Sequence, residues 1–137
     1  MTTADMLKRE EGLRLMPYDD SEGLLTIGYG RCLARKGISR AEAEMLFAND
    51  VADATALVHA SFPWAASLTE PREAVLIGMV FQMGLTGTRD FAKMLAALQR
   101  EDYATAADEM LDSKWARQTP ERAQRMARQM RSGDWAS

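Results

Sequence analysis

The chain has little of what several specialised classes of protein require. Its 137 residues include one cysteine, Cys32, and one histidine, His59. A lone cysteine excludes a disulfide framework within the chain and fits folding in a reducing compartment. One cysteine and one histidine also cannot build a zinc site, so we expect no metal and no cofactor. No apolar run is as long as a membrane span, and the first twelve residues lack the apolar core of a signal peptide. We therefore expect a soluble protein with no membrane partner.

The chain also has no excess of positive charge. The chain carries 17 Lys and Arg against 20 Asp and Glu, for a net charge of −3. Nucleic-acid-binding domains are usually basic as a whole, so we expect no nucleic-acid partner. With 47% hydrophobic and 27% charged residues, the composition is that of a globular protein.

The first third of the chain predicts a helix followed by a small sheet. Thr3 is placed to cap a helix over 3–11, and Gly12 is placed to end it. The segments "RLMPY" and "LLTIGYG" flank "DSEG", which predicts a β-hairpin. A third short strand is expected to include Cys32 and Leu33.

The remaining residues predict helices. "SRAE", from Ser39 to Glu42, is a capping box that opens a helix to about His59. Thr69 is placed to cap a helix whose body, "AVLIGMVFQM", is apolar almost all round and therefore belongs in the core. Gly84 is expected to end it, and further helices are expected at about 89–99, 102–112 and 119–131. The predicted class is α+β, predominantly helical: a single domain over 1–137, with a β-lobe at about 13–38, a connecting helix at about 39–59, and a helical lobe at 60–137 plus helix 3–11.

Candidate catalytic residues lie in "EEGLRLMPYDDSEGLLTIGYG", which begins at Glu10. Its spacing is E-x8-D-x5-T, with Glu11 at a helix end, Asp20 in a turn and Thr26 on a strand. Two carboxylates on facing elements suit glycoside hydrolysis, in which an acid and a base flank the scissile bond. The spacing alone also fits solvated acidic caps and an ordinary strand threonine.

The residues around this motif are more specific than its spacing. "LKREEGLRLMPYDDSEGLLTIGYG" closely resembles the opening of the lysozymes of T-even bacteriophages. The resemblance continues in the same order at "ISRAEAEMLFANDV", "MVFQMGLTG", "SKWARQTPERA" and "RSGDW". It covers nearly the whole chain, and it implies a two-lobed lysozyme-like fold and cleavage of peptidoglycan.

The resemblance also implies roles for individual residues. Glu11 aligns with the catalytic acid, Asp20 and Thr26 align with the pair that acts on the nucleophilic water, and Arg122 aligns with an arginine that pairs with the acid. Without the alignment, Arg122 reads equally well as part of a solvated helix face. Four further positions are implied to contact substrate, although turn geometry or core packing also explains some of them: Gly30, Cys32, Phe81 and Gln82.

Three departures from the family pattern stand out. The segment between Leu33 and Ile38 is much shorter, so the β-lobe should be trimmed and the cleft less enclosed. The family's histidine after "GYG" is Arg31 here, and its usual salt-bridge partner aligns with Asp50, which predicts an Arg–Asp pair. Cys32 occupies a position where the family has an apolar cleft residue.

The expected function is that of an N-acetylmuramidase. Such an enzyme cleaves the β-1,4 bond between N-acetylmuramic acid and N-acetylglucosamine by acid/base catalysis with inversion. The resemblance implies a monomeric phage endolysin that waits in the host cytoplasm and acts on the periplasmic cell wall after release. The alternative is a weak or inactive muramidase-fold module that binds peptidoglycan or a protein partner, which the trimmed lobe and acidic charge favour slightly.

Overall fold

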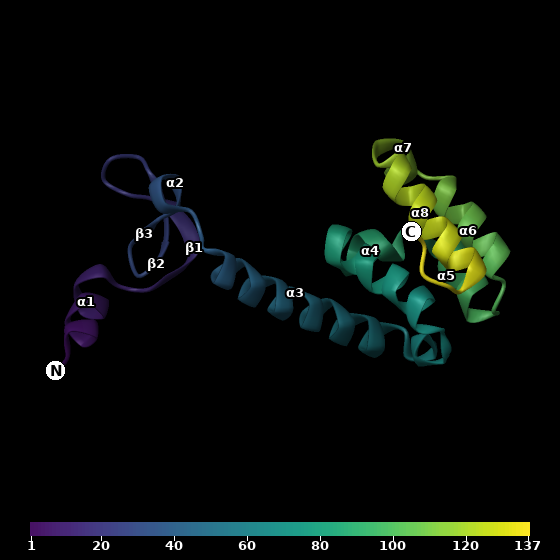
Figure 1. Cartoon of the computed structure of the whole chain (residues 1–137), viewed down its shortest axis with the longest axis horizontal. Coiled ribbons are helices and arrows are strands. Elements are labelled where there is room, and N and C mark those ends of the chain that lie inside the picture. Colours follow the sequence, from purple (N-terminus) through teal and green to yellow (C-terminus); the bar gives the residue numbers. More distant parts are fainter. The chain divides into compact units, whose positions relative to one another are not determined.

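A computed structural model describes all residues, 1–137, as helices and one small antiparallel sheet (Figure 1). This confirms the predicted α+β class with its excess of helix. The chain divides into two compact units, Met1–Leu46 and Phe47–Ser137, and each is described by itself. The elements in order are α1 (Thr3–Glu11), β1 (Arg14–Asp19), β2 (Leu25–Gly28), β3 (Arg31–Cys32), α2 (Leu33–Lys36), α3 (Arg40–Ser61), the 3-10 helix η1 (Pro63–Ser67), α4 (Glu70–Arg89), α5 (Ala92–Gln99), α6 (Tyr103–Leu111), α7 (Lys114–Gln118) and α8 (Pro120–Ser132).

Helix α1 is capped by Thr2, and the prediction that Thr3 caps it was wrong. The Thr2 hydroxyl accepts a hydrogen bond from the Asp5 backbone N–H at 3.1 Å, and the Thr2 backbone N–H donates to Asp5 Oδ2 at 2.9 Å. Asp5 therefore completes a reciprocal capping box that only a residue three positions earlier can form. Gly12 ends the helix at φ 70°, as predicted.

The sheet has the order β1-β2-β3, with both pairs antiparallel. Tyr18 and Cys32 lie opposite Thr26 on its two neighbouring strands. The predicted hairpin is confirmed, whereas Leu33 begins α2 and does not extend β3. Thr26 is the only buried residue in the first unit. Taken by itself, this unit therefore has no apolar core, and its strands are joined by backbone pairing.

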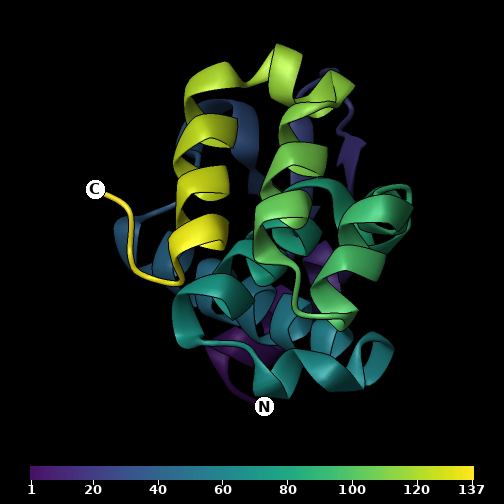
Figure 2. The same cartoon turned by 90° about the vertical axis from the view of Figure 1, so that its right-hand side faces the viewer.

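The second unit has an apolar core built around α4, as the sequence predicted. Val75, Leu76 and Met79 of this helix are at most 1% exposed. Helices α5, α6 and α8 pack together beside it, and Figure 2 shows α6 and α8 side by side with α7 at one end. They contribute further buried side chains: Met94, Ala97, Leu98, Ala106, Ala107, Met110, Ala123, Ala127 and Met130. None of the helices combines the length and apolar composition needed to cross a bilayer.

Two features of this unit concern its helix boundaries. Gly84 interrupts α4, as predicted: at φ 78° and ψ 171° it forms a kink, and a second, short helical segment follows it and continues to Arg89. Buried Thr88 secures the resumed turn, because its hydroxyl donates to the Gly84 carbonyl at 2.9 Å. The short helix α7 was not predicted; Ser113 caps it by accepting from the Ala116 N–H at 3.1 Å.

Candidate active site

Glu11 is the last residue of α1, and its carboxylate lies against Gly30. A Cβ atom added at Gly30 would come within 2.5 Å of Glu11 Oε2 and 3.0 Å of its Cδ. Gly30 also has φ +75°, a backbone conformation that favours glycine. Turn geometry and the close approach of the carboxylate therefore both require glycine here. The structure brings these two predicted site residues together.

The Asp20 carboxylate is held in the hairpin turn by backbone donors. Its Oδ1 accepts hydrogen bonds from the N–H groups of Glu22 at 2.8 Å and Leu24 at 2.9 Å. The Asp20 N–H in turn donates to the Leu24 carbonyl at 2.9 Å. These bonds fix the orientation of the side chain and leave Oδ2 available for another partner.

The Thr26 hydroxyl is anchored to the same residue as Asp20. Thr26 is 3% exposed, and its Oγ1 donates to the Leu24 carbonyl at 2.9 Å. A hydroxyl that gives its proton to a carbonyl can meet a water only as an acceptor. In this arrangement the Thr26 hydroxyl proton is already used, and its oxygen remains free to accept. Leu24, which the sequence motif did not single out, connects the two side chains.

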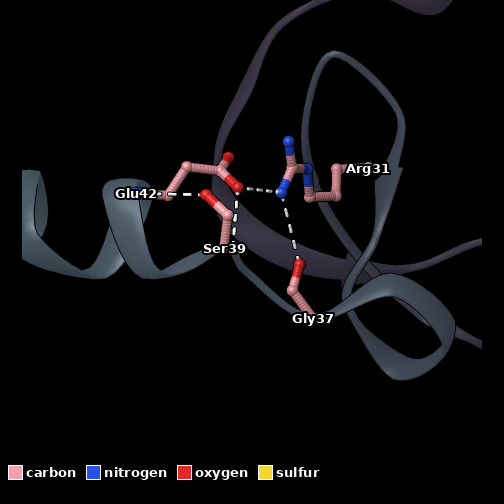
Figure 3. Close-up of polar contacts among 4 residues, drawn as sticks. All are labelled: Arg31, Gly37, Ser39 and Glu42. Carbon is pink, nitrogen blue, oxygen red and sulfur yellow. Dashed lines mark hydrogen bonds and ion pairs between the residues drawn. The ribbon is translucent and has the colours of Figure 1, made fainter.

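Cys32 is a free, half-buried thiol on β3, directly opposite Thr26 in the sheet. The structure therefore places this predicted substrate-contact residue next to the threonine of the motif. Arg31 precedes it on the same strand and forms an ion pair with Glu42, with Nη1 and Oε1 2.7 Å apart (Figure 3). This ion pair lies within the first unit. Asp50 belongs to the second unit, so the predicted pair of Arg31 with Asp50 stays a prediction.

Glu42 combines this ion pair with the predicted capping box of α3. Its Oε1 accepts from the Ser39 backbone N–H at 2.9 Å, and the Glu42 N–H donates to the Ser39 hydroxyl at 3.1 Å. The hydrogen bond from Arg31, followed by those from Ser39, lowers the pKa of Glu42 to about 2. The carboxylate therefore remains charged well into the acidic range.

In the second unit, Phe81 and Gln82 lie on α4. Phe81 is 44% exposed and packs its ring edge-to-face against Phe47, with the centroids 5.8 Å apart. Gln82 Oε1 accepts a hydrogen bond from Trp115 Nε1 at 3.0 Å. The side-chain carbonyl of Gln82 is thereby used, and its amide N–H groups are the part free to meet a sugar. Trp115 is thus a supporting residue that sequence reasoning missed, because the indole and the amide are 33 positions apart.

Arg122 lies in the first turn of α8, after Pro120 at its first position. It is half-buried and forms no ion pair within the second unit. Glu11 likewise forms none within the first unit. The pairing of Arg122 with Glu11 therefore stays a prediction. No group of three or more His, Cys, Asp or Glu side chains is arranged to hold a metal ion.

Comparison with known proteins shows the family to which the chain belongs. A sequence model of the phage lysozyme family matches residues 8–131. Probable T4-type lysozyme 1 of Dictyostelium discoideum is 30% identical, over 94% of this chain and 93% of its own length. The endolysin of Acyrthosiphon pisum secondary endosymbiont phage 1 is 30% identical, over 82% of this chain and 75% of its own. Pre-baseplate central spike protein Gp5 of Enterobacteria phage T4 is 32% identical across the whole chain, which spans 29% of that protein. The chain therefore belongs to the phage lysozyme family, and it is a lysozyme-type glycoside hydrolase that acts on peptidoglycan.

Proposed function

We propose that the protein cleaves the β-1,4 bond between N-acetylmuramic acid and N-acetylglucosamine in a single displacement with inversion. Glu11 acts as the acid, and Asp20 and Thr26 act on the water. The observation that carries this proposal is that both Asp20 and Thr26 are hydrogen-bonded to Leu24, which holds a carboxylate and a hydroxyl acceptor in one fixed arrangement.

The proton movements follow from these contacts. Glu11 gives its proton to the glycosidic oxygen as the bond to the anomeric carbon breaks. Asp20 Oδ2, which the turn leaves unoccupied, takes one proton from the attacking water. Thr26 Oγ1 accepts a hydrogen bond from the other water hydrogen, since its own proton is directed to Leu24. Positive charge that develops on the sugar ring is stabilised by the ionised Asp20.

This division of roles predicts the stereochemical outcome. A retaining enzyme holds its two carboxyls about 5 Å apart and uses one as the nucleophile, whereas an inverting enzyme leaves roughly 6.5–9.5 Å for a water. A threonine with a free acceptor is useful only if a water must be held. We therefore expect inversion, with freshly released oligosaccharide in the α-anomeric form.

The decisive measurement is proton NMR of the anomeric signals before mutarotation. Initial β-anomer would refute the water-based mechanism. Glu11→Gln should abolish cleavage while the melting temperature stays equal or rises, because a catalytic carboxyl is kept for function at some cost to stability. Glu10→Gln, at the neighbouring exposed carboxylate that pairs with Arg9, is the matched control and should remain active. If the parent protein cleaves no glycan even at high concentration, the alternative of a peptidoglycan-binding module is favoured.

We further propose that the protein acts as a monomeric endolysin, held in the host cytoplasm until the membrane is opened. The phage family and the endolysin relative support this role. Bacteria that express the protein should stay intact until chloroform is added and should then lyse. Lysis without chloroform would contradict the proposed location. The match to a spike protein of which the chain spans 29% favours a second candidate, the same activity as a module of a larger protein.

A further inference from the structure

The turn between β2 and β3 touches the helix that carries the proposed catalytic acid. Gly30 lies against the Glu11 carboxylate, and the ring of Tyr29 lies 5.4 Å from the ammonium nitrogen of Lys8. Both contacts connect α1 to the turn. Within the first unit no apolar side chain of α1 is buried, so these two contacts are the ones by which the unit itself positions α1. A shift of this turn would therefore change the contact made by the Glu11 carboxylate.

Strand β3, which follows the turn, is too short for its own backbone pairing to stabilise its position. It consists of Arg31 and Cys32 alone, paired with Ile27 and Thr26 of β2. A two-residue edge strand forms few ladder hydrogen bonds and gains little stability from them. Yet it directly follows Gly30 at one end and lies opposite Thr26 at the other. A displacement of β3 would therefore disturb both halves of the proposed catalytic machinery.

The Arg31 side chain connects this short strand to the beginning of α3. Its Nη1 donates to Glu42 Oε1 at 2.7 Å and to the Gly37 carbonyl at 3.3 Å, as Figure 3 shows. Glu42 is itself fixed by the capping box with Ser39. The side chains of Arg31 and Glu42 are 28% and 42% exposed, so their pair is less screened by solvent than the unit's other two pairs, Arg9–Glu10 and Arg35–Glu22.

We propose that Arg31 and Glu42 are positioning residues for catalysis. Their ion pair holds β3, and through β3 it keeps Gly30 against Glu11 and Cys32 beside Thr26. This inference rests on the proposed function of Glu11 and Thr26. Neither Arg31 nor Glu42 needs to touch the substrate, because each acts through the strand.

The two halves of the pair can be tested without removing the helix cap. In Glu42→Gln the amide oxygen can still accept from the Ser39 N–H, so the capping box survives while the charge is lost. Arg31→Met removes the cation and keeps an unbranched side chain. Both variants should lower kcat about 10-fold with KM unchanged, because a fraction of an ångström of misplacement affects the transition state more than substrate binding. Arg31→Lys keeps a cation and should recover most of the rate.

A double variant separates positioning from a purely structural role. If the pair acts through the contact of Gly30 with Glu11, Arg31→Met should lower kcat much less in a Gly30→Ala background than in the parent. The reason is that Gly30→Ala has already broken the contact. Asp108→Asn is the matched control: it breaks the ion pair of Arg131 and Asp108, which is 2.6 Å long and lies in the second unit. Its kcat should equal that of the parent.

The outcomes distinguish the positioning role of Arg31 and Glu42 from the proposed catalytic function of Glu11. If Glu11→Gln is inactive while Arg31→Met and Glu42→Gln retain the parent's kcat, or lose only thermal stability, the positioning role is refuted and the proposed function survives. The positioning role is also refuted if the effects of Arg31→Met and Gly30→Ala on kcat are additive in the double variant. If Glu11→Gln cleaves as fast as the parent, the proposed function fails and the positioning role fails with it. Should Arg31→Met not fold, Glu42→Gln alone decides by the same criteria.

Discussion

Replacing Gly30 with alanine would place a methyl group where the Glu11 carboxylate now lies. The new Cβ would be 2.5 Å from Oε2, about 0.9 Å short of the 3.4 Å at which ordinary contact begins. The carboxylate is the far end of a flexible side chain, so it should move while the fold persists. Displacement of a reacting group by about 1 Å can cost about 10²-fold in rate. We expect a loss of that size in the rate of peptidoglycan cleavage per folded molecule.

The chain contains a matched control for backbone strain. Gly28, the last residue of β2 before the same turn, has φ +72°, close to the +75° of Gly30, but an added Cβ there meets nothing within 4 Å. Alanine at either position should lower the free energy of unfolding by about 1–2 kcal/mol, because it must adopt a left-handed backbone conformation. Both variants should therefore lose a similar amount of stability, a few degrees in melting temperature by roughly the usual scaling. Only Gly30→Ala should lose about two orders of magnitude in activity.

The assay is the initial rate of wall lysis at a temperature well below both melting points, with the folded fraction measured by circular dichroism. Equal rates for Gly28→Ala and Gly30→Ala would show that strain in the turn, and not contact with Glu11, causes any loss. A fully active Gly30→Ala would show that the contact does not place the acid. Either result would refute the reasoning.

Three further predictions concern stability. In the folded protein the hydrogen bond from Arg31 is the largest cause that lowers the pKa of Glu42 from 4.5 to about 2. The ionised Glu42 therefore stabilises the fold fully above pH 4.5, and this stabilisation is lost as the pH falls towards 2. The difference in melting temperature between the parent and Glu42→Gln should accordingly be constant above about pH 5 and disappear near pH 2. Gln82→Leu leaves the indole N–H of buried Trp115 without its acceptor and should lower the free energy of unfolding in urea by about 1–3 kcal/mol; an unchanged value would mean that water replaces the amide. Arg72→Met removes two hydrogen bonds to carbonyls at the end of α8 and a guanidinium 3.5 Å from the ring centroid of Tyr103. It should lower the free energy of unfolding in urea by about 1–3 kcal/mol, and Arg72→Lys should lower it less.

The elements that the sequence predicted well are those whose signals are local. The capping box at Ser39 and Glu42 begins α3 because both partners lie within one helical turn. The hairpin follows from two strand-forming segments around "DSEG", and the apolar run of α4 requires burial wherever the helix packs. Such signals depend on residues that are close together in the sequence. They need no knowledge of the rest of the fold.

The errors arose where short-range signals were ambiguous or weak. Thr2 and Thr3 are equally good caps by residue type, and Asp5 decides between them because it completes a capping box only with Thr2. Helix α7 was missed because its five residues carry too little periodicity to be recognised.

The sequence by itself determined the identities and the order of the proposed catalytic groups: a glutamate at a helix end, an aspartate in a hairpin turn and a threonine on the following strand. It also determined the family, because these residues recur in order with the segments around them. Only the tertiary structure decided what each group touches. It placed Glu11 against Gly30, directed the Thr26 proton to Leu24, and paired Arg31 with Glu42. The physical reason is that a hydrogen bond or close contact forms only if the distance between two atoms is correct to a few tenths of an ångström. The residues in these contacts are up to nineteen positions apart, and spacing along the chain does not specify such distances.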